Sequence, residues 1–305
     1  MSRYERLYIE ISNVCNLQCS FCPEVIRDKK ILSLEDFKKY AQQAKPLARQ
    51  ICLHLMGEPL AHPEFSQIMD VCSEMGLRIF LTTNGTLLNR HIEKISRWEA
   101  LDQINFSVHS YFANTARQSL DDYLRPILNF CDLSYSLKHN FYINLRLWNL
   151  PQADLQASQN IRVLEALRRH FNVQLSENVD VRLGKSKKIR DRLYVHFDTE
   201  FIWPDLKQSI RSEAGTCYGL RKQLAIHANG DVVPCCLDKE SVLRLGNLNN
   251  QSLTDILKSP RATNIRSGFE RGELVEDLCR RCQYADRFRT TERLERHKND
   301  PGSPP

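Results

Sequence analysis

From the amino terminus to about residue 180, short apolar runs alternate with stretches whose apolar residues recur at helical spacing. Apolar runs bounded by polar residues predict buried strands, and the stretches between them predict amphipathic helices. Strands are expected at 7–11, 51–55, 77–82, 104–108 and 142–147, with a sixth candidate at 194–203. Repeated strand–helix units of this kind favour an α/β fold with a parallel sheet, closed or partly closed, and right-handed crossovers.

The helical stretches are expected to cover this sheet. Ser33, with Asp36 three residues later, has capping-box spacing and marks a helix start. Further apolar faces are expected at 65–75, 88–95, 127–131 and 161–171. In such folds, ligands gather at the carboxyl ends of the strands.

The alternation ends near residue 180, where a basic segment, 182–192, precedes the sixth candidate strand. Beyond Cys217 the chain is rich in turns, and Asn229-Gly230-Asp231 predicts a hairpin between 224–226 and 232–233. We therefore expect a core domain over 1–205, a small cysteine-rich domain over 206–290, and a charged helix end with a disordered tail over 291–305.

Length and composition agree with this division. A chain of 305 residues, 42% apolar and 26% charged, can bury a core and is too long for one minimal module. No apolar run approaches the roughly 18 residues of a membrane span, and the first residues lack the apolar core of a secretory signal. We expect a cytoplasmic protein without a membrane partner.

Charge and cysteine content narrow the chemistry. The net charge of +6 is concentrated at 182–192 and 280–298, which indicates a solvated surface or, as an alternative, a nucleic-acid contact. Eleven cysteines without an export signal favour metal binding or catalysis over a disulfide framework.

The densest cysteine pattern lies just after the first expected strand, at Cys15, Cys19 and Cys22. Three thiolates at this spacing can hold three corners of a cubane iron–sulfur cluster. The fourth iron has no local ligand, so it can bind an exogenous molecule through an amine and a carboxylate.

This Cys-x3-Cys-x-Phe-Cys pattern resembles that of the radical S-adenosylmethionine (SAM) superfamily. The resemblance implies a partial (β/α)6 TIM-like barrel, a [4Fe–4S] cluster held by the three cysteines, and SAM on the open iron. It also implies reductive cleavage of SAM to a 5′-deoxyadenosyl radical, which abstracts hydrogen from a substrate, and an electron donor such as flavodoxin or ferredoxin.

The resemblance extends to later strand ends. Met56-Gly57-Glu58-Pro59 resembles the Gly-Glu motif that contacts the methionyl amine of SAM, and a carboxylate is a suitable acceptor for an ammonium group. Phe21 resembles the aromatic residue that rests against the adenine. The residues expected to contact SAM are Phe21, Gly57, Glu58, Asn84, Ser107 and Arg146.

A second set of cysteines comprises Cys217, Cys235, Cys279 and Cys282. It resembles the SPASM extension in its shortened twitch form, which implies one auxiliary [4Fe–4S] cluster with four cysteine ligands. Four thiolates also suit a structural zinc, which stays open as an alternative. Cys236 could replace Cys235 as a ligand, although the offset from Gly230 favours Cys235.

The other chemistry-bearing residues give no clear assignment. Three cysteines on apolar faces, Cys52, Cys72 and Cys131, are expected to be small core residues. Six residues near strand ends could either pack or touch substrate: His54, His62, His109, Asp198, Glu200 and Trp203. The sequence selects no catalytic acid or base among them.

These features favour a radical SAM enzyme that oxidises or modifies a small molecule or a peptide. Only fourteen residues precede Cys15, which leaves no room there for a peptide-recognition domain and favours a small substrate. An RNA- or nucleotide-modifying radical SAM enzyme is the second hypothesis, because the basic segments suit phosphate. A non-catalytic iron–sulfur or zinc scaffold is the third.

Overall fold

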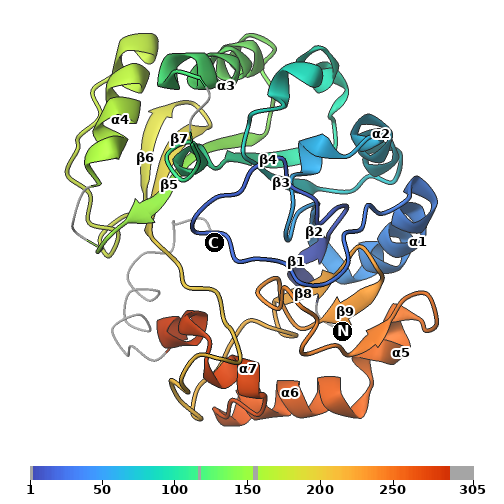
Figure 1. The fold of residues 1–305 in the computed structure, drawn as a ribbon. Coiled ribbons are helices and arrows are strands. Elements are labelled where there is room, and N and C mark those ends of the chain that lie inside the picture. Colours follow the sequence, from blue (N-terminus) through green and yellow to red (C-terminus); the bar gives the residue numbers. More distant parts are fainter. Residues whose placement is uncertain (1–2, 116–117, 154–156, 289–305) are drawn as a thin grey trace.

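The computed structural model describes residues 3–115, 118–153 and 157–288 (Figure 1). The strands are β1 (Tyr4–Ile9), β2 (Ala48–Cys52), β3 (Ile79–Thr83), β4 (Leu101–Phe106), β5 (Tyr142–Leu150), β6 (Ser186–Arg190), β7 (Leu193–Thr199), β8 (Gln223–Ile226), β9 (Asp231–Val233) and β10 (Gly246–Asn247). The α-helices are α1 (Leu34–Ala44), α2 (Phe65–Glu74), α3 (Leu120–Ser136), α4 (Ser158–Phe171), α5 (Leu253–Leu257), α6 (Pro260–Arg271) and α7 (Asp277–Arg280). Short 3₁₀ helices are η1 (Lys45–Leu47), η2 (Pro59–Ala61), η3 (Leu88–Arg90), η4 (Ile92–Arg97), η5 (Val108–Tyr111) and η6 (Gln283–Phe288).

The strands of the described residues form one sheet in the order β10-β9-β8-β1-β2-β3-β4-β5-β7-β6. Every pairing from β8 to β7 is parallel, whereas β6, β9 and β10 add antiparallel edges. Helices α1 to α4 lie around the outside of the strands (Figure 1). The two ends of the sheet do not pair, so the expected partial barrel of six parallel strands, β1 to β5 with β7, is confirmed.

The sixth candidate strand is also confirmed, as β7, and the basic segment before it contains a strand that the sequence did not predict. It forms β6, which pairs antiparallel with β7 at the edge of the sheet. Its alternating exposed and half-buried residues end at the buried Ile189. Charged side chains suit such an edge because they discourage pairing with another chain.

The helices form largely where the apolar spacing places them. Helix α1 starts after Ser33, whose hydroxyl oxygen accepts the N–H of Asp36 at 3.1 Å and so satisfies a free donor of the first turn. Helix α3 begins at Leu120, earlier than the expected face at 127–131, because Ser119 caps it and apolar residues continue through Pro126. The expected helix at 88–95 is instead the two 3₁₀ helices η3 and η4.

Each face of the sheet packs against its own apolar cluster. Alternate strand residues such as Leu7 and Ile9 pack with the helices in the main core, as the two-residue strand repeat requires. The intervening Tyr8 packs with Cys52 and Phe80 in a small cluster on the other face. This second face, the concave inner face of the partial barrel, therefore carries only a small apolar cluster. Polar residues occupy the ends of its strands.

The predicted hairpin at Asn229-Gly230-Asp231 is confirmed as the β8–β9 turn, and it joins the main sheet. Strand β8 pairs in parallel with β1, with Leu224 opposite Leu7. Because the sheet continues through the cysteine-rich part, the boundary near residue 205 stays a prediction, and the expected tail at 291–305 lies outside the described residues. Within those residues, every helix is too short or too polar to cross a membrane.

Candidate functional site

The cysteine triad lies in the loop that leaves β1. Cys15 and Cys22 are exposed and Cys19 is partly buried. The loop turns back on itself, since the N–H of Cys22 donates to the carbonyl oxygen of Cys19 at 3.0 Å. A hydrogen bond with the Cys22 thiol lowers the pKa of Cys19 to about 7, and the same bond raises the pKa of Cys22, so the pair favours one thiolate at Cys19.

Hydrogen-bond donors point at the sulfur atoms of this loop. The Leu17 N–H lies 3.5 Å from Cys15 Sγ, and Asn114 Nδ2 lies 3.0 Å from Cys19 Sγ. Asn84 Nδ2 is 3.9 Å from Cys15 Sγ. Such donors stabilise thiolates and tune iron–sulfur clusters, so the triad fits the expected [4Fe–4S] group. Asn114 was not predicted, because no local pattern connects it to a loop 95 residues earlier.

Gly57 allows the Gly-Glu segment to pack against the start of the cysteine loop. Its φ is +80°, and a Cβ there would lie 2.4 Å from the carbonyl oxygen of Ser12 and 2.9 Å from that of Val14. The next N–H, from Glu58, donates to the Val14 carbonyl at 3.0 Å. A side chain larger than hydrogen would therefore separate the two segments.

Glu58 is a buried carboxylate beside the triad. Its Oε1 accepts the Thr83 hydroxyl at 2.6 Å and the Leu60 N–H at 2.9 Å, and its Oε2 accepts the Asn84 N–H at 2.7 Å. Burial raises the pKa of Glu58, and these donors oppose that rise. Held rigidly in this way, the carboxylate can receive an ammonium group without reorganising.

The three later strand ends differ in their distance from the triad. Asn84 lies beside it, because its amide also donates to Asn16 Oδ1 at 3.0 Å. Ser107 lies one strand further, where its N–H donates to the Thr83 carbonyl at 2.8 Å. Arg146 lies on the concave face of β5, with its guanidinium 4.2 Å from the ring centroid of Trp148.

The environment of Arg146 is mainly aromatic and apolar. Its guanidinium also lies 5.7 Å from the Phe80 ring centroid, and its Nη1 makes a long hydrogen bond of 3.4 Å to the Thr82 hydroxyl. Burial lowers the pKa of Arg146 to about 9. The structure thus brings Gly57, Glu58 and Asn84 to the triad and leaves Arg146 as a cation on the concave face.

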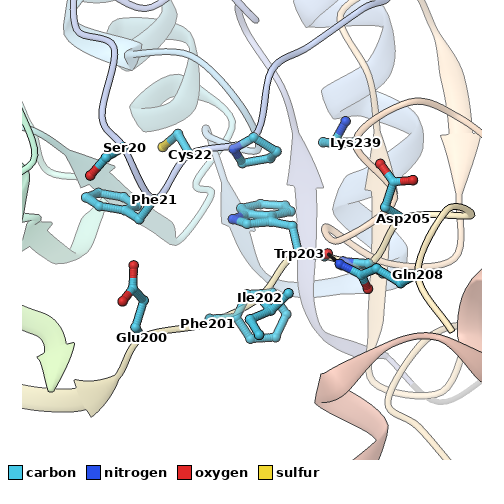
Figure 2. A pocket seen from close by; sticks show the side chains of 12 residues that line it. Ser20, Phe21, Cys22, Glu200, Phe201, Ile202, Trp203, Asp205, Gln208 and Lys239 are labelled. Carbon is cyan, nitrogen blue, oxygen red and sulfur yellow. Dashed lines mark hydrogen bonds between the residues drawn. The ribbon is translucent and has the colours of Figure 1, made fainter. Parts of the chain in front are cut away.

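A pocket of about 320 Å³ lies against the third cysteine (Figure 2). It is lined by Ser20, Phe21, Cys22, Pro23, Glu200, Phe201, Ile202, Trp203, Pro204, Asp205, Gln208 and Lys239. Figure 2 shows Trp203 at its centre, with Phe21 and Glu200 on one side and Asp205 and Lys239 on the other. The segment after β7 thus meets the cysteine loop and the C-terminal part around one cavity.

Among the six undecided residues, Glu200 and Trp203 line this pocket. His109 contacts it indirectly, since its ring centroid is 4.7 Å from that of Phe21. His62 has both ring nitrogens occupied by backbone groups of Leu32 and Glu64.

The other two undecided residues are held by protein neighbours. Burial lowers the pKa of His54 to about 3, and its ring lies between those of Tyr8 and Phe80. Asp198 pairs with Lys185 at 2.5 Å and with Arg287 at 3.5 Å. Backbone hydrogen bonds and ion pairs therefore account for His62 and Asp198, whereas His54 Nδ1 is buried without a hydrogen-bond partner among the described residues.

The second cysteine set converges from three segments: the turn before β8, the end of β9, and α7 with its following turn. Burial raises the pKa of Cys235 well above its ordinary value, and Cys217, Cys279 and Cys282 are close enough to raise it further. Burial also raises the pKa values of Cys217 and Cys282, and the nearby backbone N–H groups of Gly219 and Tyr284 oppose that rise. Burial favours the neutral thiols, and a bound cluster would supply the positive charge that stabilises four thiolates here, as the expected iron–sulfur group requires.

Cys235 and its neighbour Cys236 face different surroundings. The Cys236 thiol lies 4.0 Å from Gln223 Oε1 and also hydrogen bonds with Tyr8. It packs against the small cluster that contains Tyr8 and Cys52. Cys217 also lies near Cys236, so the choice of Cys235 as the ligand stays a prediction. The expected core positions of Cys52, Cys72 and Cys131 are confirmed, since each is at most 2% exposed.

Residues 9–143 match the radical SAM superfamily, and residues 217–283 match SPASM, an iron–sulfur cluster-binding domain. These domains imply SAM, the [4Fe–4S] cluster that binds it, and auxiliary iron–sulfur ligation in the cysteine-rich part. A probable GTP 3′,8-cyclase of Saccharolobus islandicus (strain Y.N.15.51 / Yellowstone #2) is 25% identical over 289 residues, covering 86% of this chain and 90% of the relative.

Solved structures share the fold. BtrN in complex with AdoMet and 2-DOIA has a TM-score of 0.59 at 17% identity, covering 93% of this chain and 94% of BtrN. Streptococcus suis SuiB bound to precursor peptide SuiA has a TM-score of 0.59 at 16% identity, covering 88% of this chain and 67% of SuiB. At these identities the likeness concerns the fold alone.

Proposed function

We propose that this chain, a radical SAM enzyme with a SPASM domain, carries out a net oxidation or another modification of a small molecule or a peptide. The observation that carries the proposal is the exposed triad loop, with the buried Glu58 carboxylate on one side and the pocket at Cys22 on the other. The protein groups around such a site bind and orient, while the cofactor supplies the difficult chemistry.

The proposed cluster ligands are Cys15, Cys19 and Cys22. These three cysteines would hold the cluster, which would supply the electron for reductive cleavage of SAM and so the radical chemistry that removes hydrogen from a substrate. Glu58 receives the methionyl amine, and Gly57 keeps the Glu58 segment close to the cysteine loop. The remaining proposed contacts to SAM are Phe21 toward the adenine and Asn84, Ser107 and Arg146 toward the ribose and carboxylate.

The pocket between Phe21 and Trp203 is the proposed substrate site, because it opens directly beside Cys22. Its walls come from the cysteine loop, the segment after β7, and Lys239. Together these segments can exclude water from a reactive radical. Figure 2 shows the Glu200 carboxylate on the Phe21 side of this pocket, which makes Glu200 the first candidate to bind or deprotonate substrate.

The C-terminal cysteines are the reason to propose a net oxidation. An auxiliary cluster at Cys217, Cys235, Cys279 and Cys282 would accept one electron from the substrate radical, and loss of a proton would complete a two-electron oxidation. The relatives include a probable nucleotide cyclase and an enzyme bound to a precursor peptide, so fold and domains leave both small and peptide substrates open. We propose a flavodoxin or ferredoxin as electron donor.

RNA is a less favoured substrate, because the basic segment is engaged within the protein. Lys187 Nζ donates to the carbonyl oxygens of Ser176 and Asn178 at 2.7 and 2.5 Å. Arg190 pairs with the Asp132 carboxylate and lies 4.6 Å from the ring centroid of Tyr135. Contacts of this kind leave less free charge for phosphate groups than the sequence alone suggested.

The proposal is tested with anaerobically reconstituted, reduced protein, SAM, and a metabolite extract from cells grown in deuterated medium. Deuterium in 5′-deoxyadenosine is expected, and fractionating the extract then identifies the hydrogen donor. A peptide fraction and an RNA fraction tested separately distinguish the substrate classes. Iron-loaded protein that forms no 5′-deoxyadenosine with any fraction contradicts the proposal.

A further inference from the structure

The segment that follows Cys22 is held by a turn more than 200 residues away in the sequence. The Glu240 carboxylate accepts the N–H of Ile26 on Oε1 at 2.9 Å and the N–H of Arg27 on Oε2 at 3.0 Å. Lys239 Nζ donates to the Glu24 carbonyl oxygen at 2.8 Å. Three hydrogen bonds thus fasten residues 24–27 to the turn that follows Cys235 and Cys236.

Arg27 continues this connection toward the barrel. Its Nε donates to the Lys239 carbonyl oxygen at 2.6 Å, and its Nη2 contacts the Glu10 carboxylate at 2.5 Å. Glu10 lies next to β1, is fully buried, and also accepts the N–H groups of Met56 and Ala228 at 3.2 Å each. The end of the cysteine loop, the Gly-Glu segment and the β8–β9 turn therefore meet at one carboxylate.

These contacts are shielded from water, which distinguishes them from ordinary surface ion pairs. The side chains of Lys239, Arg27 and Glu240 are 8%, 11% and 19% exposed. Although burial acts in the opposite direction, hydrogen bonds from Lys239, Ile26 and Arg27 lower the pKa of Glu240 below its usual range. Charge-assisted bonds at shielded positions hold a segment more firmly than exposed pairs do.

We propose that Lys239 and Glu240 are positioning residues that fix residues 24–27 and thereby keep the third cysteine of the triad in place. This role rests on the proposed function of Cys22 as a cluster ligand, only two residues before Glu24. Lys239 also lines the pocket together with Cys22 and Phe21, so the same turn shapes the proposed substrate site. The C-terminal part thus contributes to the radical site through side chains as well as through its cysteines.

Hydrogen exchange of the reconstituted enzyme tests this role at the amides concerned. Glu240→Gln replaces one acceptor oxygen by a donor group, so it cannot receive both N–H groups. We expect exchange at Ile26 and Arg27 to become about 10-fold faster, the effect of losing one hydrogen bond to a charged group. The triad cluster, followed by its SAM-sensitive electron paramagnetic resonance signal, should lose iron to a chelator at least about threefold faster.

Glu273→Gln is the matched control, because Glu273 belongs to the same part of the chain and its carboxylate pairs with Arg271 on the surface. It should leave both rates within about twofold of the unchanged enzyme. If Glu240→Gln does not fold, Lys239→Met keeps the Glu240 carboxylate and should accelerate exchange about threefold.

Unchanged exchange at Ile26 and Arg27 in a folded variant overturns the proposal, as does an equal acceleration in Glu273→Gln. The exchange result is independent of turnover. If the enzyme without substitutions forms no 5′-deoxyadenosine, the proposed function is contradicted, but the hydrogen-exchange test of Lys239 and Glu240 still stands.

Discussion

The two cysteine sets place the same side chain in opposite surroundings. The triad comes from one loop of eight residues, and Cys15 and Cys22 are exposed. The C-terminal set comes from three segments, all four of its members are partly buried, and burial raises their thiol pKa values. An open set of three leaves room for an added ligand, whereas an enclosed set of four completes the coordination by itself.

The two sets also differ in what holds them. Residues far away in the sequence position the triad. Asn114 contacts the sulfur of Cys19, Gly57 packs against the backbone at the start of the loop, and Glu240 accepts the N–H of Ile26 just after the loop. The three segments of the C-terminal set are joined by backbone hydrogen bonds, such as that from the Arg211 N–H to the Arg280 carbonyl oxygen at 2.8 Å. The triad should therefore be the more sensitive of the two to substitution of distant side chains.

Loss of one ligand from the open set should give the largest effect. Cys22→Ala leaves two thiolates, too few to hold a cluster with one open iron, and should lower reductive SAM cleavage more than about 100-fold. Chromatography of 5′-deoxyadenosine measures the rate. Cys72→Ala, on the buried face of α2, is the control and should keep cleavage within about twofold. Undiminished cleavage in Cys22→Ala contradicts the triad assignment.

Substitution of a cysteine in the C-terminal set should lower the iron content of the protein while reductive cleavage of SAM is retained. Cys235→Ala should lose about four of the roughly eight irons of two four-iron clusters and still cleave SAM. Cys236→Ala is the matched control and should keep all of the iron, because its thiol contacts Tyr8 instead. Iron, sulfide and zinc analysis gives the answer. Iron loss in Cys236→Ala alone reverses the ligand assignment, and zinc at this set contradicts an auxiliary cluster.

A methyl group added at Gly57 should destabilise the protein, because it would push the Gly-Glu segment away from the start of the cysteine loop. Gly57→Ala combines a positive φ with a Cβ 2.4 Å from a backbone oxygen, and should lower the free energy of unfolding by about 3 kcal/mol. Gly76→Ala is matched, since Gly76 has φ +61° and no atom within 4 Å of the added Cβ. It should cost about 1 kcal/mol in urea unfolding. Equal costs would show that the close approach to Ser12 is not tight.

Lowering the pH should lower the free energy of unfolding partly through His109, whose ring packs on Phe21 in the loop that carries the triad. Burial lowers the pKa of His109 to about 4, so below its ordinary value near 6.5 the unfolded chain binds a proton that the folded chain does not. Stability is therefore lost as the pH falls from about 6.5 toward 4, by about 2 kcal/mol at pH 5 for this residue.

Urea unfolding of the reconstituted enzyme at pH 7 and pH 5 checks this contribution. In His109→Asn the difference between the two free energies of unfolding should shrink by about 2 kcal/mol. An unchanged difference would mean that the imidazole titrates alike in the folded and unfolded chains.

Local sequence pattern was sufficient for most elements and for the composition of both cysteine sets. Buried strands, the Ser33 cap and the hairpin at Gly230 follow from residue spacing and turn chemistry, which depend on neighbours a few residues apart. The cysteine spacings are local in the same sense. Pattern failed at 88–95 and at the start of α3, where apolar spacing alone does not distinguish helix types or boundaries.

Only the tertiary structure decided how distant segments meet. The edge strand β6, the pairing of β8 with β1, the Asn114 contact to Cys19 and the Glu10–Arg27–Glu240 connection all join residues without a shared local pattern. Their partners are selected by packing of the whole sheet and by the need of buried charges for one another. The sequence by itself therefore determined most of the parallel strands and which cysteines are proposed as ligands, because both depend on local spacing. The fold determined which distant side chains contact the cysteine loop, because those contacts depend on the packing of the whole sheet.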